Sequence, residues 1–318
     1  MYHCIINPRA GRSRGKELIS SIEDFMKKHN KEIVIKEPIS PQDSTDWVRD
    51  ACLAKSEGII GVGGDGTIQA IVTGMLRNSK ECQIPLGIIS CGSGNDLSRT
   101  FASFIPSVKQ SEEDSLQQFL MRVIRGEHKT IDAIRVNDKV CLNVANMGLD
   151  ARIVKNAKRY KKFLGGKAYL LSAIISIFQH ENLGLHMFIE GEQKITIQNK
   201  EEIAKVEYEV KSHYTLLAIC NGQYYGGGMR IAPSAKLNDG KITLCLIDDL
   251  SRAKAFRLFP TILIQKHMYL KDVNYLECTR IKIIPERSQI SLCMDGNLSD
   301  VTGALEVNLL PNAIKVTF

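Results

Sequence analysis

The stretch Gly61-Val62-Gly63-Gly64-Asp65-Gly66-Thr67 decides the fold of the first half of this chain. It follows a short apolar run, Gly58-Ile59-Ile60, and leads into Ile68-Gln69-Ala70-Ile71-Val72. That order predicts a buried strand, a glycine turn and then a helix. A glycine turn at the start of a helix directs backbone N–H groups toward one point, where the helix dipole adds positive potential. Such a turn suits a phosphate group.

Asp65 narrows the chemistry of this loop. The spacing Gly61-x-Gly63-x-x-Gly66 also fits the dinucleotide fingerprint, but that pattern alone is weak. Asp65 argues against it, because a carboxylate repels phosphates unless a divalent cation or water lies between them. A phosphate loop with its own Asp indicates a metal-nucleotide and phosphoryl transfer. The alternative is a tight strand–helix turn in which Asp65 is only the N-cap.

Length and composition limit the architecture and the compartment. A chain of 318 residues is long for a single core, so we expect two domains. The net charge of +7 favours an anionic partner, namely a nucleotide, a nucleic acid or an acidic membrane. Nine scattered cysteines without a C-x-x-C pair, and no signal-peptide pattern, predict a reducing cytoplasm. The longest mainly apolar run, Tyr169 to Phe178, is too short to cross a bilayer.

Strand and helix patterns alternate through the first part of the chain. Four apolar runs, each followed by a helical pattern, predict strands at residues 2–6, 33–35, 58–60 and 85–89. This alternation predicts an open, mostly parallel sheet that binds ligands at the carboxyl ends of its strands. The Asn7–Gly11 turn, the 61–67 loop and a second glycine loop at residues 90–96 all follow such strands. We therefore expect these three turns to converge on one ligand.

After about residue 130, short alternating segments predict antiparallel strands in an all-β sandwich or barrel. The clearest are residues 186–189, 206–210, 215–220, 242–247, 281–284 and 290–294. One helix interrupts them at about Ser251 to Gln265. An earlier basic helix is expected to bind acidic lipid, unless it is an ordinary solvated face, through Lys155, Lys158, Arg159, Lys161 and Lys162. The cleft between the two domains is the expected active site.

With these residues in view, the chain resembles the diacylglycerol kinase catalytic family, in its bacterial soluble lipid-kinase branch. The first-domain motifs are Asn7-Pro8-x-Ala10-Gly11, Gly63-Gly64-Asp65-Gly66-Thr67 and Gly92-Ser93-Gly94-Asn95-Asp96-Leu97. The second-domain motifs are Asn143-Val144-x-x-x-Gly148-x-Asp150-Ala151, Asn221-Gly222, Gly226-Gly227-Gly228, Ala232-Pro233 and Asp239-Gly240. Each motif alone is moderately specific, but in this order and at this spacing they are strongly specific for the family.

The resemblance implies an α/β plus all-β fold. Residues 1–130 would form an open α/β nucleotide-binding domain like those of phosphofructokinase and NAD kinase. Residues 131–318 would form a β-sandwich domain, with the last ~10 residues returning to the first domain. ATP would lie in the cleft between the two domains. The implied reaction transfers the ATP γ-phosphate to a hydroxyl of a membrane lipid such as diacylglycerol, with Mg²⁺ as the metal.

The resemblance also implies the site residues. ATP would contact Asn7, Pro8, Arg9, Ala10, Gly11, Ser40, Gly64, Asp65, Gly66, Thr67, Ile68, Gln69, Ala70 and Ser93. Asp65 would hold the magnesium-nucleotide through water. A structural Mg²⁺ in the second domain would lie at Lys236, Asp239 and Lys241. The two lysines would act there through backbone carbonyls, because an ammonium group cannot bind a cation. Without the resemblance, Asp239-Gly240 is an ordinary hairpin turn.

Two departures from the family pattern bear on activity. The family usually follows its Gly-Asp-Gly-Thr with Asn-Glu one residue later, where this chain has Gln69-Ala70. The family's catalytic base is the Glu of an Asp-Gly-Glu motif, where this chain has Asp295-Gly296-Asn297. Because an amide has no usable base at neutral pH, we expect weak or narrow activity. Asp295 and Asp300 are the nearby carboxylates that could substitute as the base, with Asp300 expected on a turn three residues beyond Asn297.

Three hypotheses follow for function. The first is an ATP-dependent lipid kinase. The second is a phosphotransferase similar to NAD kinase, which shares the Gly-Gly-Asp-Gly loop. The third is a catalytically weak or inactive relative that binds a nucleotide or a lipid, and Asn297 keeps it open. The expected partners are a lipid substrate and an anionic membrane touched peripherally, with no nucleic acid. A homodimer is a possible assembly.

Overall fold

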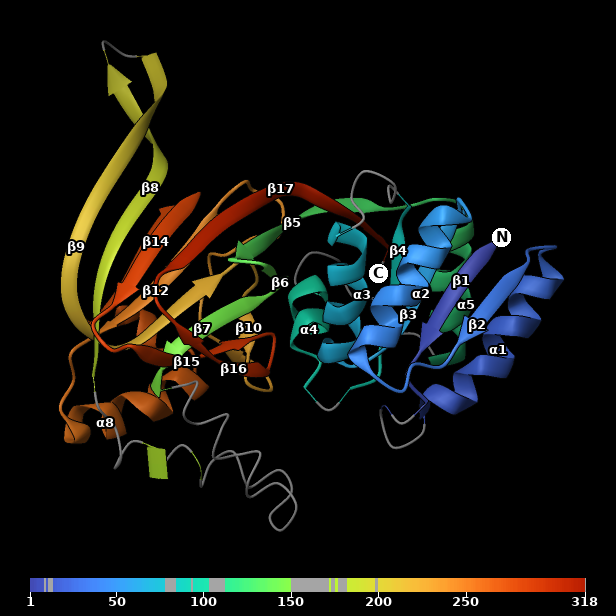
Figure 1. Cartoon of the computed structure of the whole chain (residues 1–318), viewed down its shortest axis with the longest axis horizontal. Helices are drawn as coiled ribbons and strands as arrows, with labels where there is room; N and C mark the ends of the chain where they lie inside the picture. The colour runs from blue at the N-terminus through green and yellow to red at the C-terminus, as the bar shows by residue number, and fades with distance from the viewer. Residues whose placement is uncertain are drawn as a thin grey trace. The chain divides into compact units, whose positions relative to one another are not determined.

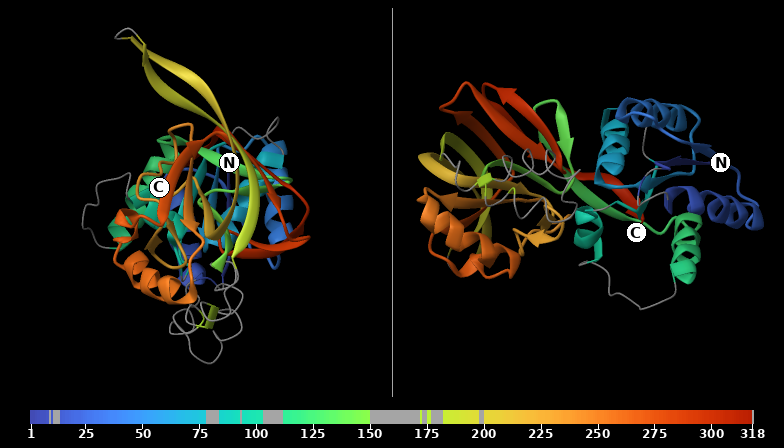
Figure 2. Two further views of the ribbon diagram at one scale, coloured as in Figure 1. Left: turned by 90° about the vertical axis from the view of Figure 1, so that its left-hand side faces the viewer. Right: turned by 90° about the horizontal axis from the view of Figure 1, so that it is seen from below.

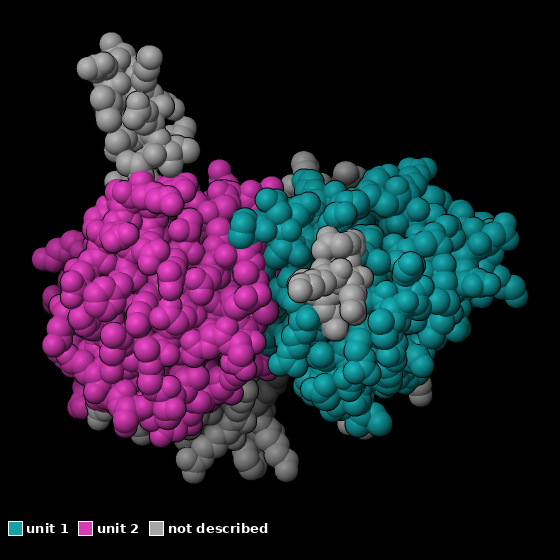
Figure 3. Space-filling model, turned by 45° about the horizontal axis from the view of Figure 1, so that its top comes forward, with its two compact units in different colours: residues 1–133, 311–318 teal, residues 134–310 magenta. Residues whose placement is uncertain are grey.

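The computed structural model describes residues 1–8, 10, 14–77, 84–92, 94–102, 112–149, 172, 175–176, 182–197 and 200–317. The chain forms two compact units, which Figure 3 colours separately. Unit 1 comprises Met1–Ala133 and Pro311–Phe318, and unit 2 comprises Ile134–Leu310. Two strands, β5 (Lys129–Val136) and β17 (Leu305–Thr317), contribute residues to both units. Each unit has its own hydrophobic core.

Unit 1 is built on a parallel sheet in the strand order β17-β4-β3-β1-β2 (Figure 1). The first four strands of the chain are β1 (Tyr2–Ile6), β2 (Ile33–Lys36), β3 (Gly58–Gly63) and β4 (Leu86–Ser90). β1 pairs with β2 and β3, β3 pairs with β4, and Val316 of β17 pairs with Leu86. Because all of these pairings are parallel, the carboxyl ends of β1, β3 and β4 lie at one edge. The predicted open parallel sheet is confirmed.

Helices cover both faces of this sheet, as the second view of Figure 2 shows. They are α1 (Arg14–Lys28), α2 (Pro41–Leu53), α3 (Asp65–Arg77), α4 (Asp96–Ala102) and α5 (Glu112–Ile124). On one face, Met26 of α1 and Leu120 of α5 pack against Cys4 of β1 in a single cluster. On the other face α2 and α3 lie so close that a Cβ on Gly74 would meet Val48 at 3.0 Å. Helices are therefore packed on both faces of the sheet.

Unit 2 is an antiparallel β-sandwich, as the recurring alternation predicted. Its strand order is β16-β15-β7-β9-β8-β14-β17, with β12 pairing β9 and β13. The strands are β6 (Lys139–Cys141), β7 (Val144–Gly148), β8 (Leu183–Ile197), β9 (Lys200–Cys220), β10 (Tyr224–Tyr225), β11 (Met229–Arg230), β12 (Ile242–Asp248), β13 (Val273–Cys278), β14 (Arg280–Pro285), β15 (Gln289–Met294) and β16 (Asn297–Thr302). Side chains such as Leu185, Leu217, Leu292 and Val307 meet in its main core cluster.

The strands predicted at residues 206–210 and 215–220 are parts of one long strand, β9. β9 pairs with β8 from Leu183 opposite Tyr214 to Ile197 opposite Lys200. The prediction of a break was wrong because the connecting residues, 211–214, contain neither Gly nor Pro and continue the extended chain. Beyond Glu190, which pairs with Arg280 of β14, the two strands extend from the sheet as a ribbon (Figure 1).

The helix predicted at about residues 251–265 is α8 (Arg252–Leu263). Ser251 is its N-cap, and the hydroxyl of Ser251 accepts the N–H of Lys254 at 3.5 Å. A short 3₁₀ helix, η1 (His267–Tyr269), follows it. One side of α8 packs on a second core cluster of unit 2 through Leu258 and Phe259. The opposite side is solvent-exposed.

The basic helix expected to bind acidic lipid falls outside the described residues. This applies to Lys155, Lys158, Arg159, Lys161 and Lys162. Across the part of the chain that the structure does describe, no helix combines the length and apolar character needed to span a membrane.

Candidate functional site

Three loops meet at the carboxyl edge of the unit 1 sheet. Asn7, which follows β1, donates its side-chain N–H to the hydroxyl of Thr67 at 3.4 Å. The backbone N–H of Asn7 donates to the carbonyl of Val62 in β3 at 2.8 Å. After β4, Cys91 donates its N–H to the carbonyl of Gly63 at 2.9 Å. The loops after β1, β3 and β4 are therefore joined directly, as their positions in the sequence predicted.

Glycines allow the two glycine loops to touch through their backbones. A Cβ on Gly92 would lie 2.6 Å from the Cα of Gly64, and a Cβ on Gly64 would lie 3.2 Å from the Cα of Gly92. A Cβ on Gly94 would lie 3.1 Å from Oδ2 of Asp65. The backbones of Gly64 and Gly92 cannot move aside as the end of a flexible side chain could. The first turn of α3 directs its N–H groups to the same edge.

Asp65 links the two glycine loops. Its Oδ2 accepts the N–H of Asp96 at 3.2 Å, and its Oδ1 accepts the N–H of Leu97 at 3.4 Å. Burial raises the pKa of Asp65, and these hydrogen bonds oppose that rise. Because α3 begins at Asp65 itself, this residue is not the N-cap of its own helix. The simple N-cap alternative is wrong in that form, since the carboxylate caps the next helix, α4.

Other predicted nucleotide contacts in unit 1 have local structural roles. Ala10 donates its N–H to the carbonyl of Asn7 at 3.1 Å, and Pro8 lies half-buried in the same turn. Ser40 is the N-cap of α2, because its hydroxyl accepts the N–H of Asp43 at 3.2 Å and its own N–H donates to Asp43 at 3.0 Å. Ser40 follows β2, whose carboxyl end lies at the same sheet edge.

The residues of α3 that were predicted to contact the nucleotide differ in their solvent exposure. Ile68 and Ala70 are buried, at 1% and 8% exposure. A Cβ on Gly61 would meet the end of Ile68 at 3.1 Å, so this side chain packs on β3. Any contact of Ile68 or Ala70 with a nucleotide must therefore use the backbone. Gly66 is exposed and Gln69 half-buried. Three predicted contacts lie outside the described residues: Arg9, Gly11 and Ser93.

In unit 2, Asp295 and Gly296 form a two-residue turn between β15 and β16. Met294 pairs with Asn297 across this turn. Both turn residues have positive φ, 46° for Asp295 and 81° for Gly296, as a type I′ turn requires. The Asp-Gly pair is thus the residue choice that this hairpin geometry demands.

The side chain of Asp295 holds the segment before β7. Its carboxylate accepts hydrogen bonds from the N–H groups of Leu142 (2.8 Å), Asn143 (2.9 Å) and Val144 (3.2 Å), and from the thiol of Cys141 (3.2 Å). Burial raises the pKa of the Asp295 carboxyl, and the four hydrogen bonds oppose that rise. The carboxylate that was expected to substitute as a catalytic base is thus engaged by four donors, and its catalytic role stays a prediction.

Asp300 was expected on a turn three residues beyond Asn297. Both residues instead lie in β16, where they are exposed. Side chains alternate between the two faces of a strand, so residues three apart face opposite sides. Asp300 accepts a hydrogen bond from the hydroxyl of Ser291 at 2.6 Å. The expected turn is therefore wrong, and Asp300 faces the side of the strand opposite to Asn297; its role as a substitute base stays a prediction.

The predicted metal residues of unit 2 lie in one turn before β12. Asp239 is exposed, and its Oδ1 accepts the N–H of Lys241 at 3.2 Å. The Lys241 ammonium pairs with Glu277, and the backbone carbonyl of Lys241 is the group that a cation would contact. Lys236 is exposed. Within the described residues, no group of three His, Cys, Asp or Glu side chains could hold a metal ion.

The sequence singled out Asn143 and Asn221 as motif residues, but it did not show what they do. The N–H groups of Asn221 and Gly222 both donate to the carbonyl of Asn143 at 2.9 Å. The side-chain N–H of Asn221 donates to the carbonyl of Leu142 at 2.8 Å. These buried amides fix the segment that Asp295 also holds. A buried amide in an otherwise apolar run is the signal for such a role, since buried polar groups need partners.

Both units match known domains at the sequence level. Residues 1–136 match the diacylglycerol kinase catalytic domain. Residues 143–318 match the YegS C-terminal NAD kinase beta sandwich-like domain. The chain belongs to the diacylglycerol kinase catalytic-domain family. The resemblance drawn from the glycine loops and the second-domain motifs is confirmed.

Similar proteins carry lipid-kinase names. One from Enterobacter sp. (strain 638), described as "Probable lipid kinase YegS-like", is 27% identical over 236 residues, which cover 74% of this chain and 71% of its own. A diacylglycerol kinase from Mycobacterium tuberculosis (strain ATCC 25618 / H37Rv) is 27% identical over 272 residues, covering 84% and 78%. The crystal structure of a diacylglycerol kinase from Bacillus anthracis str. Sterne matches with a TM-score of 0.72 at 21% identity, covering 100% of this chain and 96% of that chain. This last match supports the fold alone.

Proposed function

We propose that this chain is an ATP-dependent lipid kinase, which transfers the γ-phosphate of ATP to a hydroxyl of a membrane lipid such as diacylglycerol. The observation that carries the proposal is the meeting of the Asn7, Gly64 and Gly92 loops at one edge of the parallel sheet. Glycine loops beside a helix N-terminus make a backbone-lined site for an anion. Family membership supports phosphoryl transfer, and the names of the relatives support a lipid acceptor.

The residues around the loops fit a magnesium-nucleotide. Oδ1 of Asn95 is buried and has no hydrogen-bond partner within the described residues. This oxygen lies at the second glycine loop, where a Cβ on Gly92 would be 3.0 Å away. Because it has no partner in that part of the chain, it can accept a hydrogen bond from a bound water. Both oxygens of Asp65 hold N–H groups, so Asp65 would act on a cation through water. Mg²⁺, when bound, would neutralise charge on the phosphates.

The chain's own groups would do the remaining work at these loops. The N–H groups of the first turn of α3 and the Thr67 hydroxyl would orient the phosphates. Asp65 would keep the two loops in register while its charge faces the hydrated cation. In this proposal the loops position the nucleotide, and positioning is the main requirement of a loose phosphoryl-transfer transition state.

Deprotonation of the acceptor hydroxyl is where this chain departs from its family. Asn297 can orient the hydroxyl by a hydrogen bond but cannot take its proton. Asp295 is committed to its four donors and Asp300 faces the other side of β16. The proposed activity is therefore slow. Asn297 also favours a second candidate function, a catalytically inactive relative that binds the nucleotide or the lipid.

The remaining partners are proposals of the same kind. A second Mg²⁺ would rest on the single Asp239 carboxylate and on backbone carbonyls of Lys236 and Lys241, and such hard oxygen ligands suit this ion. The lipid acceptor implies peripheral contact with an anionic membrane. A homodimer would be detected by light scattering.

A lipid-panel kinase assay tests the proposed function. The protein is incubated with labelled ATP and Mg²⁺ against vesicles containing diacylglycerol, another glycerolipid or a sphingoid base, and separately against NAD. Mass spectrometry should detect one phosphorylated lipid, formed slowly and lost with EDTA. Phosphorylation of NAD alone would favour the NAD kinase-like alternative. Bound ATP with no phosphorylated product would favour the inactive relative.

A further inference from the structure

One surface of unit 2 exposes apolar side chains that the proposed chemistry does not use. Among the residues whose burial is described, eleven large hydrophobic side chains are exposed, and six of them fall within one short segment. These six are Phe256, Leu263, Ile264, Met268, Tyr269 and Leu270. Their exposed fractions run from 36% for Leu270 to 80% for Tyr269. Such a concentration marks an interaction surface, whereas single exposed hydrophobic residues are ordinary.

The geometry of α8 separates these side chains from the core. The helix buries one stripe, which consists of Ala255, Leu258, Phe259 and Ile262. Phe256, Pro260 and Leu263 are all exposed and follow the spacing i, i+4, i+7, so they form a second stripe roughly a third of a turn around the helix from the buried one. Figure 1 shows α8, in orange, at the outside of unit 2. Within the residues that the structure describes, the second stripe is therefore not part of a core cluster.

Cations flank this exposed stripe. The segment 251–271 contains no Asp or Glu, and its basic residues, all exposed, are Arg252, Lys254, Arg257, Lys266 and Lys271. Lys254 lies 3.5 Å from Asp272. For the other four, the described part of the chain shows no ion pair. We name these five cations and the six apolar residues the α8 patch. Exposed apolar side chains beside an uninterrupted set of cations are typical of elements that lie in a membrane interface.

We propose that the α8 patch is the surface by which unit 2 docks on an anionic membrane. Its apolar side chains would enter the headgroup region, and its cations would contact lipid phosphates. This proposal rests on the proposed function, because that function places the acceptor lipid in a membrane. A second copy of the chain is a poorer occupant, because a symmetric contact through this patch would bring two sets of like charges together. Charge complementarity therefore selects the anionic lipid surface.

Vesicle binding of surface variants tests this proposal without turnover. The apolar variant is Phe256→Ser with Leu263→Ser, and the charge variant is Arg257→Glu with Lys266→Glu. Vesicles of phosphatidylcholine with phosphatidylglycerol should bind the wild-type chain. Each cation near an anionic surface is worth about fivefold in partition, so the charge variant should bind at least tenfold more weakly. The apolar variant should lose binding to a similar extent, and pure phosphatidylcholine should bind poorly.

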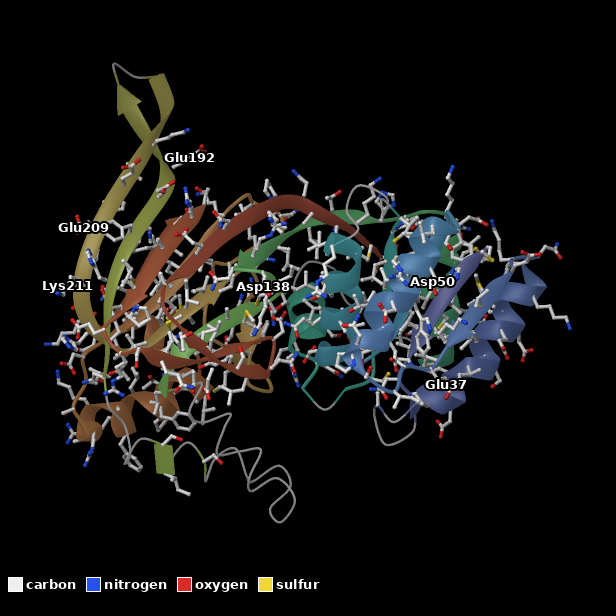
Figure 4. All side chains as sticks on the ribbon, viewed as in Figure 1. Glu37, Asp50, Asp138, Glu192, Glu209 and Lys211 are labelled. Carbon is white, nitrogen blue, oxygen red and sulfur yellow. The ribbon has the colours of Figure 1, made fainter. Side chains whose placement is uncertain are left out.

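Matched controls come from the β8–β9 hairpin of the same unit. Tyr208 is 40% exposed, and Lys211 is an exposed cation that Figure 4 labels on β9. Tyr208→Ser and Lys211→Glu should each bind vesicles within twofold of wild type. If both patch variants bind like the controls, the proposal is overturned. If wild type does not bind anionic vesicles, it is overturned as well. It is equally overturned if the patch variants change only the oligomeric state in light scattering.

A fluorescence measurement keeps the test independent of variant folding. Trp47 is the chain's one tryptophan, so Trp47→Phe provides a dark background. In that background, the indole introduced by Phe256→Trp should be quenched by brominated acyl chains, and the one introduced by Tyr208→Trp should not. Absence of quenching at position 256 in vesicle-bound protein would place the docking surface elsewhere. The vesicle and quenching measurements need neither a nucleotide nor an acceptor lipid. Membrane docking can therefore be rejected while the kinase function stands, and the kinase function can be rejected while docking stands.

Discussion

The carboxylate of Asp65 accepts the backbone N–H of Asp96 at 3.2 Å, so a side chain of the first glycine loop holds the start of the helix after the second. The backbones of Gly64 and Gly92 meet beside this bond. The two loops therefore behave as one structural piece. A change at Asp65 acts on loop geometry and on the charge offered to a cation at once, so only matched variants can separate the two effects.

Asp65→Asn should abolish turnover and also destabilise the chain modestly. The amide keeps one acceptor oxygen but turns an N–H₂ group toward a backbone donor. Loss of a helix cap typically costs about 1 kcal/mol. The missing charge removes the group proposed to face the hydrated cation. Lipid phosphorylation and the free energy of unfolding by denaturant measure the two effects.

Asp43→Asn is the matched control for Asp65→Asn. Asp43 also accepts two backbone N–H groups at a helix start, those of Ile39 at 2.9 Å and Ser40 at 3.0 Å. Its replacement should cost a similar free energy of unfolding but leave turnover near wild type. Full turnover of Asp65→Asn would reject a catalytic role and leave only the cap on α4.

Gly92→Ala should be more damaging than Gly64→Ala. The added Cβ would lie 2.6 Å from a backbone Cα in the first variant and 3.2 Å in the second. Overpacking of this kind typically costs about 1–3 kcal/mol, and the strain here would separate the two loops. ATP affinity by calorimetry should fall in the same order as the free energy of unfolding. The reverse order would show that the loops do not need their close backbone contact.

The fold of unit 1 could be predicted because each of its strands ends at a clear turn. Gly and Pro, or the polar turn after Ile6, interrupt the apolar runs, and parallel pairing then places the turns at one edge. The β8–β9 hairpin could not be predicted, because its length depends on tertiary pairing rather than on a local signal at residues 211–214.

The site was predictable only where residue type dictates conformation. The Asp295-Gly296 turn follows from its two residues, since both positions need positive φ. The partners of Asp65 and Asp295 could not be predicted, because they are backbone N–H groups, which every residue carries. To predict the face of the strand on which Asp300 lies, one must know the residue at which β16 begins, because a shift of one residue reverses the faces of a strand.

Asp295→Asn should destabilise the chain strongly. One carboxylate oxygen becomes an N–H₂ group that faces N–H donors from the segment before β7. Leaving buried donors unsatisfied typically costs about 1–3 kcal/mol each, so a total loss of about 3 kcal/mol or more is expected. Urea unfolding at neutral pH measures it.

Asp300→Asn is the control for that stability prediction. Asp300 is exposed and accepts one hydrogen bond, from Ser291. Its replacement should change the free energy of unfolding by less than about 1 kcal/mol and leave turnover within a few-fold of wild type. A stable Asp295→Asn variant without turnover would restore Asp295 as a catalytic candidate, and loss of turnover in Asp300→Asn would do the same for Asp300.

Asn297→Glu should raise turnover on a suitable lipid by at least about tenfold, because general-base help is typically worth about 10²–10⁴-fold. Asn297 is the first residue of β16 and is exposed, so a longer carboxylate can be accommodated without burying a charge. The gain should appear in kcat with ATP affinity unchanged, since a general base acts on the acceptor hydroxyl and not on the nucleotide. Asn297→Gln is the matched control, because it adds the same length without a base and should leave turnover at the wild-type level. Equal gains in both variants would mean that the length of the side chain, and not proton transfer, limits the wild-type chain.

A wild-type chain that already turns over at a typical kinase rate and gains nothing from Asn297→Glu would show that this enzyme works without the family's base. Bound ATP with no turnover in any of the three forms would favour the inactive relative.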